Sequence, residues 1–329
     1  MTQPAPAALG IALVLLSAVG LAAQNVVSRL FFVPAPLFGQ AAFGGWIPPT
    51  FGNIVLILAL RMGGMAVLLG AIAPILHAQT FTTLKKLPRD RQLCGYVLGS
   101  GLCLFVGLTS LYFALSQVVA GIAIAAFFIY PAITVLLAWR ILHQRLRPYQ
   151  LGLMTLLFIG VALTTLESNA ASSANPTLGI LAGLTAGLSF GLYGIFAELA
   201  LQNQARSLAL HPVPFSLATF LVVATLSSLS LPIIGNIEIT PATWLPVLIT
   251  TLFSAILTVI AYVLNNFGIR IIGASLTALI SASTPALTAL FAWVALQEAL
   301  QGQQMAGIGL VTIGVAALSC KPGKPSADS

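Results

Sequence analysis

The sequence predicts an all-α integral membrane protein with ten transmembrane helices, arranged as two inverted five-helix repeats. Three observations predict this fold class. The 329 residues are 59% apolar and only 6% charged, whereas about a quarter of the residues in soluble proteins are charged. The apolar residues form long, nearly continuous runs, and the second half of the chain repeats part of the first.

Ten apolar segments predict the helices, because a helix needs roughly 20 apolar residues to cross a bilayer. In the first half they cover 8–30, 53–76, 93–114, 118–139 and 149–166. In the second half they cover 178–201, 215–234, 244–265, 273–296 and 303–319. Polar, basic or Pro- and Gly-rich stretches separate the segments and favour turns.

The stretches between the segments differ in character along the chain. A Pro- and Gly-rich stretch at 31–52 follows the first segment and predicts a long outer loop. Basic stretches follow the second and fourth segments, and a Ser-, Asn- and Ala-rich linker at 167–177 separates the halves. We therefore expect a first repeat over 1–166, a second over 178–319 and a cytoplasmic tail at 320–329.

The basic residues orient the helices, because loops rich in Lys and Arg stay in the cytoplasm. With the N-terminus inside, eleven of the thirteen basic residues fall on the cytoplasmic side. The exceptions are Arg29, at the outer end of the first segment, and Arg61, inside the second. We expect a plasma (inner) membrane protein with both termini in the cytoplasm.

Composition and motifs exclude several functional classes. The basic residues are scattered and form no patch for nucleic acid, despite a net charge of +7. The sequence has no His-Glu-x-x-His motif and no Gly-rich phosphate loop. We therefore expect no enzyme activity, no metal and no cofactor. Cys94, Cys103 and Cys320 lack paired spacing, so we expect no disulfide.

An internal repeat relates the two halves. Between residues 131 and 162, fourteen of 32 positions match the residue 154 positions later, including Pro131 with Pro285 and Trp139 with Trp293. Because five helices is an odd number, the second half enters the membrane from the opposite side. Inverted repeats are typical of secondary transporters, in which two similar halves open a central site to each side in turn.

Several stretches resemble EamA-type transporters of the drug/metabolite transporter superfamily, over 9–166 and 178–319. They are Gln24-Asn25, Arg61, the run Ala-Tyr-Val-Leu-Asn-Asn at 261–266, and Thr-Pro-Ala-Leu-Thr-Ala-Leu at 284–290 followed by Glu298. The resemblance implies ten helices, cytoplasmic termini, a central cavity and movement of small organic solutes, often metabolite or amino-acid efflux. Gln144 departs from the pattern, since the matching position in the second half is the acidic Glu298.

Two prolines predict where the central cavity lies. Pro131 and Pro285 fall near the middle of predicted helices, where a proline frees the carbonyls of Phe127 and Ser281. In a membrane, such carbonyls are tolerated only inside protein or beside a water-filled cavity. We expect the two prolines to act as kinks that shape or gate the cavity; simple packing kinks are the alternative.

Polar and aromatic residues around the kinks are the expected substrate contacts, because small-molecule sites combine apolar walls with a few hydrogen-bonding groups. The predicted set is Gln24, Asn25, Arg61, Tyr112, Phe127, Tyr130, Tyr193, Tyr262, Asn265, Ser281 and Thr284. For each residue the alternative is a structural role, at the membrane interface or within its own helix.

Ionisable residues are rare inside the predicted spans. Arg61 must face protein or water, so it either binds a substrate carboxylate or phosphate or clamps helix-end carbonyls and polar partners such as Gln24. We expect Glu198 at the membrane interface. The histidines fall in predicted cytoplasmic loops, at His77, His143 and His211. We therefore expect facilitated diffusion or weakly coupled exchange rather than a proton pump.

A glycine every fourth residue marks the sixth segment, at Gly179, Gly183, Gly187 and Gly191. Such a ridge allows another helix to approach closely. We expect it to pack within the chain, with a dimer contact as the alternative.

Together these features predict a secondary transporter that exports small organic metabolites, such as amino acids, by alternating access. Its expected partners are the solute and the lipid bilayer, without nucleic acid, and a monomer would suffice. A channel-like facilitator and a non-transporting membrane scaffold or sensor are the alternatives.

Overall fold

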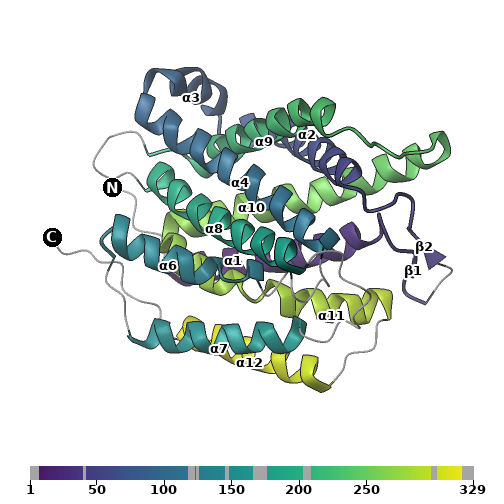
Figure 1. Ribbon diagram of the computed structural model, residues 1–329. Coiled ribbons are helices and arrows are strands. Elements are labelled where there is room, and N and C mark those ends of the chain that lie inside the picture. The colour runs from purple at the N-terminus through teal and green to yellow at the C-terminus, as the bar shows by residue number, and fades with distance from the viewer. Residues whose placement is uncertain are drawn as a thin grey trace.

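The computed structural model describes residues 7–39, 42–117, 123, 126–144, 148–165, 176–202, 209–297 and 302–320. Most of these residues lie in helices that run alongside one another (Figure 1). The longer ones are α1 (Ala7–Arg29), α2 (Phe51–Leu76), α4 (Arg91–Gln117), α8 (Pro176–Leu201), α9 (Pro212–Ile234) and α10 (Trp244–Ser281). The shorter ones are α6 (Tyr130–Ile141), α7 (Pro148–Thr165), α11 (Thr284–Leu296) and α12 (Gly302–Cys320).

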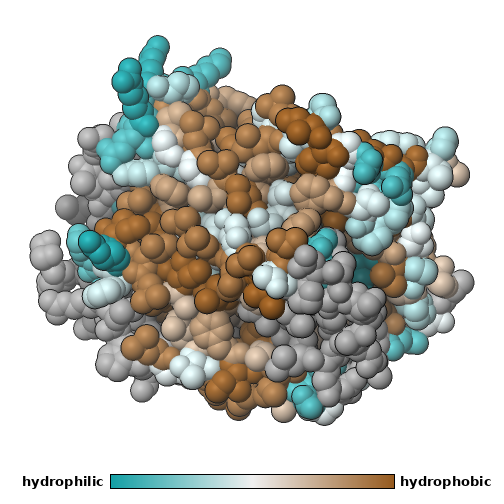
Figure 2. Space-filling view, in the orientation of Figure 1, coloured by the Kyte–Doolittle hydropathy of each residue, from teal (hydrophilic) through white to brown (hydrophobic). Residues whose placement is uncertain are grey.

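The surface of the bundle is suited to lipid. Within the described residues, six helices are long and apolar enough to cross a membrane. Large apolar side chains are exposed on them, such as Val67 on α2, Leu229 on α9 and Ile260 on α10. Figure 2 shows a broad hydrophobic band between more hydrophilic ends on the face in view. Exposing so much apolar surface to water would be unfavourable, so the band faces lipid and the chain is a multi-pass membrane protein.

Short elements lie at the two ends of the bundle. α3 (Thr80–Lys86) and η1 (Leu87–Arg89) join α2 to α4 at one end, and the antiparallel pair β1 (Ala35–Pro36) and β2 (Ala42–Phe43) lies at the other (Figure 1). A further short helix, η2 (Pro241–Thr243), precedes α10. The sequence predicted loops in these places, because none of these pieces is long or apolar enough to be recognised by pattern.

A buried asparagine joins the loop after α9 to the start of α2. The Asn53 side chain accepts a hydrogen bond of 2.9 Å from the Glu238 N–H and donates one of 3.2 Å to the Glu238 carbonyl. It is fully buried. One side chain therefore satisfies both backbone groups of a loop residue, as a strand neighbour would.

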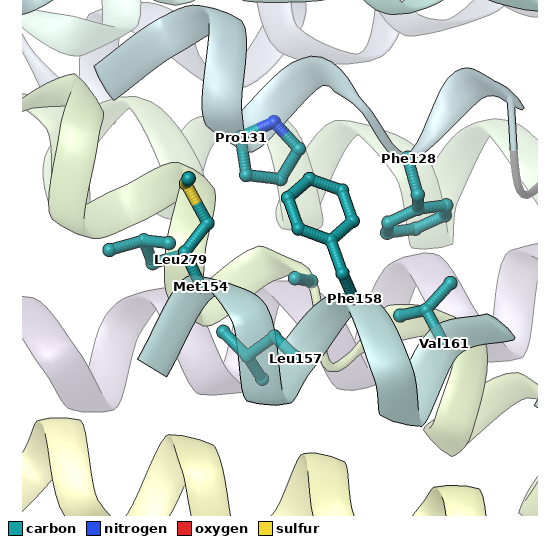
Figure 3. A pocket seen from close by; sticks show the side chains of 8 residues that line it. Phe128, Pro131, Met154, Leu157, Phe158, Val161 and Leu279 are labelled. Atoms are coloured by element: carbon teal, nitrogen blue, oxygen red, sulfur yellow. The ribbon is translucent and has the colours of Figure 1, made fainter. Parts of the chain in front are cut away.

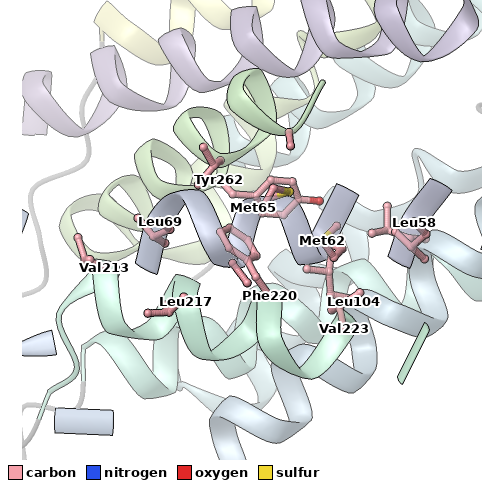
Figure 4. Close-up of a cluster of buried hydrophobic side chains, with 14 of the residues drawn as sticks. Leu58, Met62, Met65, Leu69, Leu104, Val213, Leu217, Phe220, Val223 and Tyr262 are labelled. Atoms are coloured by element: carbon pink, nitrogen blue, oxygen red, sulfur yellow. The ribbon is translucent and has the colours of Figure 1, made fainter. Parts of the chain in front are cut away.

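The helices pair in a regular way. α1 packs along α10, α2 along α9, α4 along α8 and α7 along α12, while α6 and α11 lie against α8 and α1. The largest buried apolar cluster lies between α2, α4, α9 and α10 and includes Met62, Met65, Phe220 and Tyr262 (Figure 4). The centre of the protein is thus built from helices of both halves of the chain.

The glycine ridge of α8 packs within the chain. A Cβ added at Gly187 would lie 2.8 Å from the Phe127 carbonyl oxygen, and one at Gly191 would lie 2.6 Å from Ile133 Cγ2. α8 can approach the chain around 126–134 this closely only because these positions carry no side chain.

Two predicted helices in the second half differ in part from the structure. The helix predicted at 244–265 continues as far as a break at Gly273, whose φ is +83°, and a second helix begins at this break, as predicted. The helix predicted at 273–296 is divided, because α10 ends at Ser281 and α11 begins at Thr284. Pro285 prevents an uninterrupted helix beyond Ser281, because it lacks the N–H group that would bond to the Ser281 carbonyl.

The first half has a similar division. The predicted helix at 118–139 is interrupted by a turn at 128–129, and α6 begins at Tyr130. Residues 118–122, most of the predicted linker at 167–177 and nearly all of the predicted tail at 320–329 lie outside the described residues.

Candidate functional site

Pro131 and Pro285 lie in the first turns of α6 and α11 rather than in the middle of continuous helices. A proline fits this position because its missing N–H would have no partner there in any case. The Thr284 hydroxyl donates a 2.7 Å hydrogen bond to the Ser281 carbonyl, the group that Pro285 leaves free. The matching carbonyl in the first half, that of Phe127, lies against Gly187. The freed backbone groups are therefore enclosed by protein, as a membrane requires.

A row of contacting aromatic rings crosses the centre of the bundle. Phe127 contacts Tyr130 with ring centroids 5.1 Å apart and Phe190 at 4.9 Å. Phe190 contacts Tyr193 at 6.4 Å, and Tyr193 contacts Tyr262 at 6.5 Å. The structure thus brings four predicted substrate contacts from both halves of the chain into one continuous set.

Hydroxyl and amide groups meet at one end of this row of rings, beside the break between α10 and α11. Ser281 Oγ donates a 3.4 Å hydrogen bond to Asn265 Oδ1, and Tyr130 interacts with Ser281. Because Tyr130 belongs to α6, the predicted polar contacts of both broken helices lie together.

At the other end lie Arg61 and Tyr112. Arg61 is 3% exposed, and its Nη2 donates a 2.8 Å hydrogen bond to the Tyr112 hydroxyl. Its guanidinium carbon lies 5.9 Å from the centroid of the same ring. Tyr262, the last of the aromatic rings described above, lies near both residues. The row of rings therefore ends close to the buried cation.

Gln24 and Asn25 have other partners. Gln24 donates to the hydroxyl of Ser28, one turn later in α1, so Arg61 does not clamp Gln24 as one interpretation of the sequence proposed. The exposed Asn25 donates a 3.2 Å hydrogen bond to the Thr288 hydroxyl and so joins α1 to α11.

Two hollows lie beside these groups. One, with a cavity volume of about 20 Å³, is lined by Ser28, Phe31, Phe32, Ile54, Ile57 and Tyr112. The other, with a cavity volume of about 10 Å³, lies next to both helix breaks and is lined by Phe128, Pro131, Met154, Leu157, Phe158, Val161, Leu279 and Ala282 (Figure 3). Each hollow has room for about one water molecule, whereas sites for drug-sized ligands occupy about 300–1,000 Å³, so helices must move before either hollow admits an organic solute.

Asn266 is a central polar residue that sequence reasoning missed. It is 1% exposed, its Oδ1 accepts a 3.0 Å hydrogen bond from the Tyr193 hydroxyl, and its Nδ2 donates at 2.8 Å to Ser216. The sequence shows the Asn265-Asn266 pair, but neighbouring helix positions point about 100° apart. Only the packing of α10 decides which amide faces which partner.

Glu198, which was expected at the membrane interface, lies near the end of α8 and is buried, with 4% of its surface exposed. One carboxylate oxygen accepts a 2.6 Å hydrogen bond from the Ala274 N–H, and the other accepts one of 2.6 Å from the Gln144 amide. Gln144 in turn accepts a 3.1 Å hydrogen bond from the Ser275 hydroxyl. The uncharged amide of Gln144 therefore connects the end of α6 to Glu198 on α8 and to Ser275 on α10.

Comparison with known proteins agrees with this architecture. The model of the EamA-like transporter family matches residues 8–166 and 177–320. The chain belongs to the EamA-like transporter family. Its resemblance to EamA-type transporters, drawn from the sequence, is therefore confirmed, and the protein is a membrane transporter.

Two further similarities support the EamA-like assignment. The chain is 34% identical over 324 residues to an uncharacterized transporter of Synechocystis sp.. The aligned region covers 97% of this chain and 95% of that protein. It also resembles the chain of a crystal structure with a TM-score of 0.69 and 19% identity, over 96% of this chain and 97% of the other. The second similarity shows a shared fold alone.

Proposed function

We propose that this transporter exports small organic metabolites, such as amino acids, across the plasma membrane by alternating access, with both termini in the cytoplasm. One observation carries the proposal: a connected set of aromatic and hydrogen-bonding side chains lies in the centre, directly beside two broken helices. Broken helices inside a membrane are typical of binding sites in secondary transporters. The solute and the lipid bilayer are the proposed partners, and a monomer suffices.

The proposal includes ten spans in two inverted repeats, and the helix contacts support it. The repeat pairs α1 with α8, and α4 with α10. Under this pairing, the contact of α1 with α10 is equivalent to that of α8 with α4. In the same way, α6 against α8 is equivalent to α11 against α1. Two halves in equivalent contacts can exchange conformations, which is how alternating access works.

Counterflow in proteoliposomes tests the proposal. Vesicles are preloaded with a mixture of amino acids and other small metabolites, and uptake of trace labelled solute is followed. We expect saturable accumulation that Tyr130→Trp and Ser281→Trp abolish, because a larger ring fills the centre. Leu229→Trp is the control, since Leu229 is 65% exposed and faces away from the core.

The alternatives give different results. A channel would show flux that does not saturate and no counterflow. A scaffold or sensor would show no flux for any solute, from protein shown to be folded. Accumulation that survives both central Trp variants would contradict the proposed site.

A further inference from the structure

Arg61 is a buried charge without an acidic partner in the described part of the chain. Its guanidinium stays protonated in proteins and is 3% exposed. The described acidic residues are engaged or located elsewhere. Asp90 accepts from the N–H groups of Gln92 and Leu93, Glu198 accepts from Ala274 and Gln144, and Glu238 is in the loop after α9.

The hydrogen bonds of Arg61 are also incomplete. Nη2 donates to Tyr112, but the buried Nε–H has no hydrogen-bond partner among the described residues. Burying a charge without an opposite charge and without full hydrogen bonding is costly. Inside a membrane, such a group is retained mainly for function. A ligand that supplies both a negative charge and an acceptor would remove this cost.

The surroundings indicate what kind of ligand fits. Tyr112 also lines the hollow of about 20 Å³, whose other lining residues include Phe31, Phe32 and Ser28. A ligand that enters as the helices move apart would meet mainly apolar and aromatic surface, with the Tyr112 phenol at one side and Arg61 hydrogen-bonded behind it. This combination suits a small apolar or aromatic body that carries one negative group.

We propose that Arg61 and Tyr112 recognise the carboxylate of the transported solute, so that the substrate class is small organic acids with an apolar or aromatic body. This inference rests on the proposed transport function. The planar guanidinium fork pairs with both oxygens of a carboxylate, and the Nε–H is its unused donor. Tyr112 orients the fork from the side of the hollow.

Paired probes of equal shape test the charge requirement. Equilibrium dialysis of the purified full-length protein in detergent compares labelled benzoate with labelled benzamide, which differ mainly in charge. We expect saturable binding of benzoate at least tenfold tighter than that of benzamide, because hydrogen bonds between charged partners are substantially stronger than neutral ones. Equal affinities would overturn the inference.

Variants then test the residues. We expect Arg61→Gln to weaken benzoate binding about 10- to 100-fold and to abolish the preference over benzamide. Arg140→Gln, which removes an exposed charge at the end of α6, should bind as the wild type does. Unchanged benzoate binding in folded Arg61→Gln protein would overturn the inference.

Tyr112→Phe decides the matter if Arg61→Gln does not fold, because it removes one hydroxyl and keeps the ring. We expect severalfold weaker benzoate binding with the charge preference retained, and unchanged binding would overturn the role of Tyr112. The counterflow assay separates this inference from the transport function. Counterflow of neutral solutes without benzoate binding would overturn the anion site and leave the carrier intact.

Discussion

Glu198 on α8 accepts a 2.6 Å hydrogen bond from the backbone N–H of Ala274 on α10. Ala274 directly follows Gly273, whose φ of +83° divides α10 in two. The second part of α10 therefore starts with an N–H group that a carboxylate from another helix satisfies. Since the N-terminus of a helix carries partial positive charge, Glu198 stabilises a helix end inside the protein.

Gly273→Ala should destabilise the protein by about 1–3 kcal/mol, the usual cost of holding a non-glycine residue in this backbone region. The new Cβ would also lie 3.3 Å from Glu198 Oε1. Thermal unfolding in detergent measures the effect. Gly63→Ala is the matched control, because a Cβ there meets nothing within 4 Å. Equal melting temperatures for the two variants would contradict the assignment.

Asn266→Ala should cost more stability than Tyr193→Phe. The first change removes the acceptor of the Tyr193 hydroxyl and the donor to Ser216, and each buried group left unpaired costs about 1–3 kcal/mol. The second removes a single hydrogen bond, worth on average about 0.6 kcal/mol in a membrane protein. Thermal unfolding of both variants side by side tests the order, and the reverse order would refute the network.

Gly187→Ala should destabilise the protein by about 1–3 kcal/mol through overpacking. The added Cβ would lie 2.8 Å from the Phe127 carbonyl oxygen, and a backbone atom cannot rotate away as a side chain can. Gly95→Ala on α4 is the control, since its Cβ has no neighbour within 4 Å. The melting temperatures should separate the two variants; a Gly187→Ala protein as stable as the control would show that α8 can shift.

Acidification should destabilise the protein through His211. Its Nδ1 accepts a 3.3 Å hydrogen bond from Val213 N–H at the start of α9, and its ring stacks on His77 at 4.3 Å. Burial, then the neighbouring His77 and Arg270, lower the pKa of His211 to about 4, from about 6.5 in an unfolded chain. Between these values the unfolded chain binds more protons, so stability falls as the pH drops from about 6.5 to about 4.

His211→Asn tests the origin of this pH dependence, because asparagine also caps helices well but does not titrate. We expect its melting temperature to fall less between pH 6.5 and pH 4.5 than that of the wild type. His143→Asn is the control, at an exposed position whose φ of +54° suits asparagine. A His211→Asn protein with the wild-type profile would assign the pH dependence to other groups.

The sequence predicted the positions of most helices, and the reason is visible in particular elements. α2, α4 and α9 begin and end within three residues of the predicted 53–76, 93–114 and 215–234, because an uninterrupted apolar run has few alternatives to a helix in lipid. The first part of α10 continues to the break at Gly273 instead of ending at Asn265, because Arg270 was interpreted as a loop residue. Arg270 is exposed at the bundle surface, where a charge can reach polar surroundings.

Some residues of the centre, such as Tyr130 and Ser281, were named from their positions around Pro131 and Pro285, and others, such as Tyr193 and Tyr262, from their residue type. The structure brings many of them together. Asn266 and Ser216 were missed, and the partners of Glu198 were not predicted. Each lies on a helix whose neighbours are mostly apolar, and nothing in the local pattern distinguishes a polar residue that faces the centre from one that faces lipid or loop. Their partners are 50 to 76 residues away along the chain.

The sequence by itself determined the membrane environment, the family and the approximate extent of most helices, because these depend on composition, local hydrophobicity and runs of matching residues. Only the tertiary structure decided that Arg61 faces Tyr112 instead of Gln24, that Glu198 holds the Ala274 N–H, and that Asn266 pairs with Tyr193. The physical reason is that a side chain's partner depends on the rotation and depth of each helix against its neighbours. Those are properties of packing between segments far apart in the chain, and no local pattern encodes them.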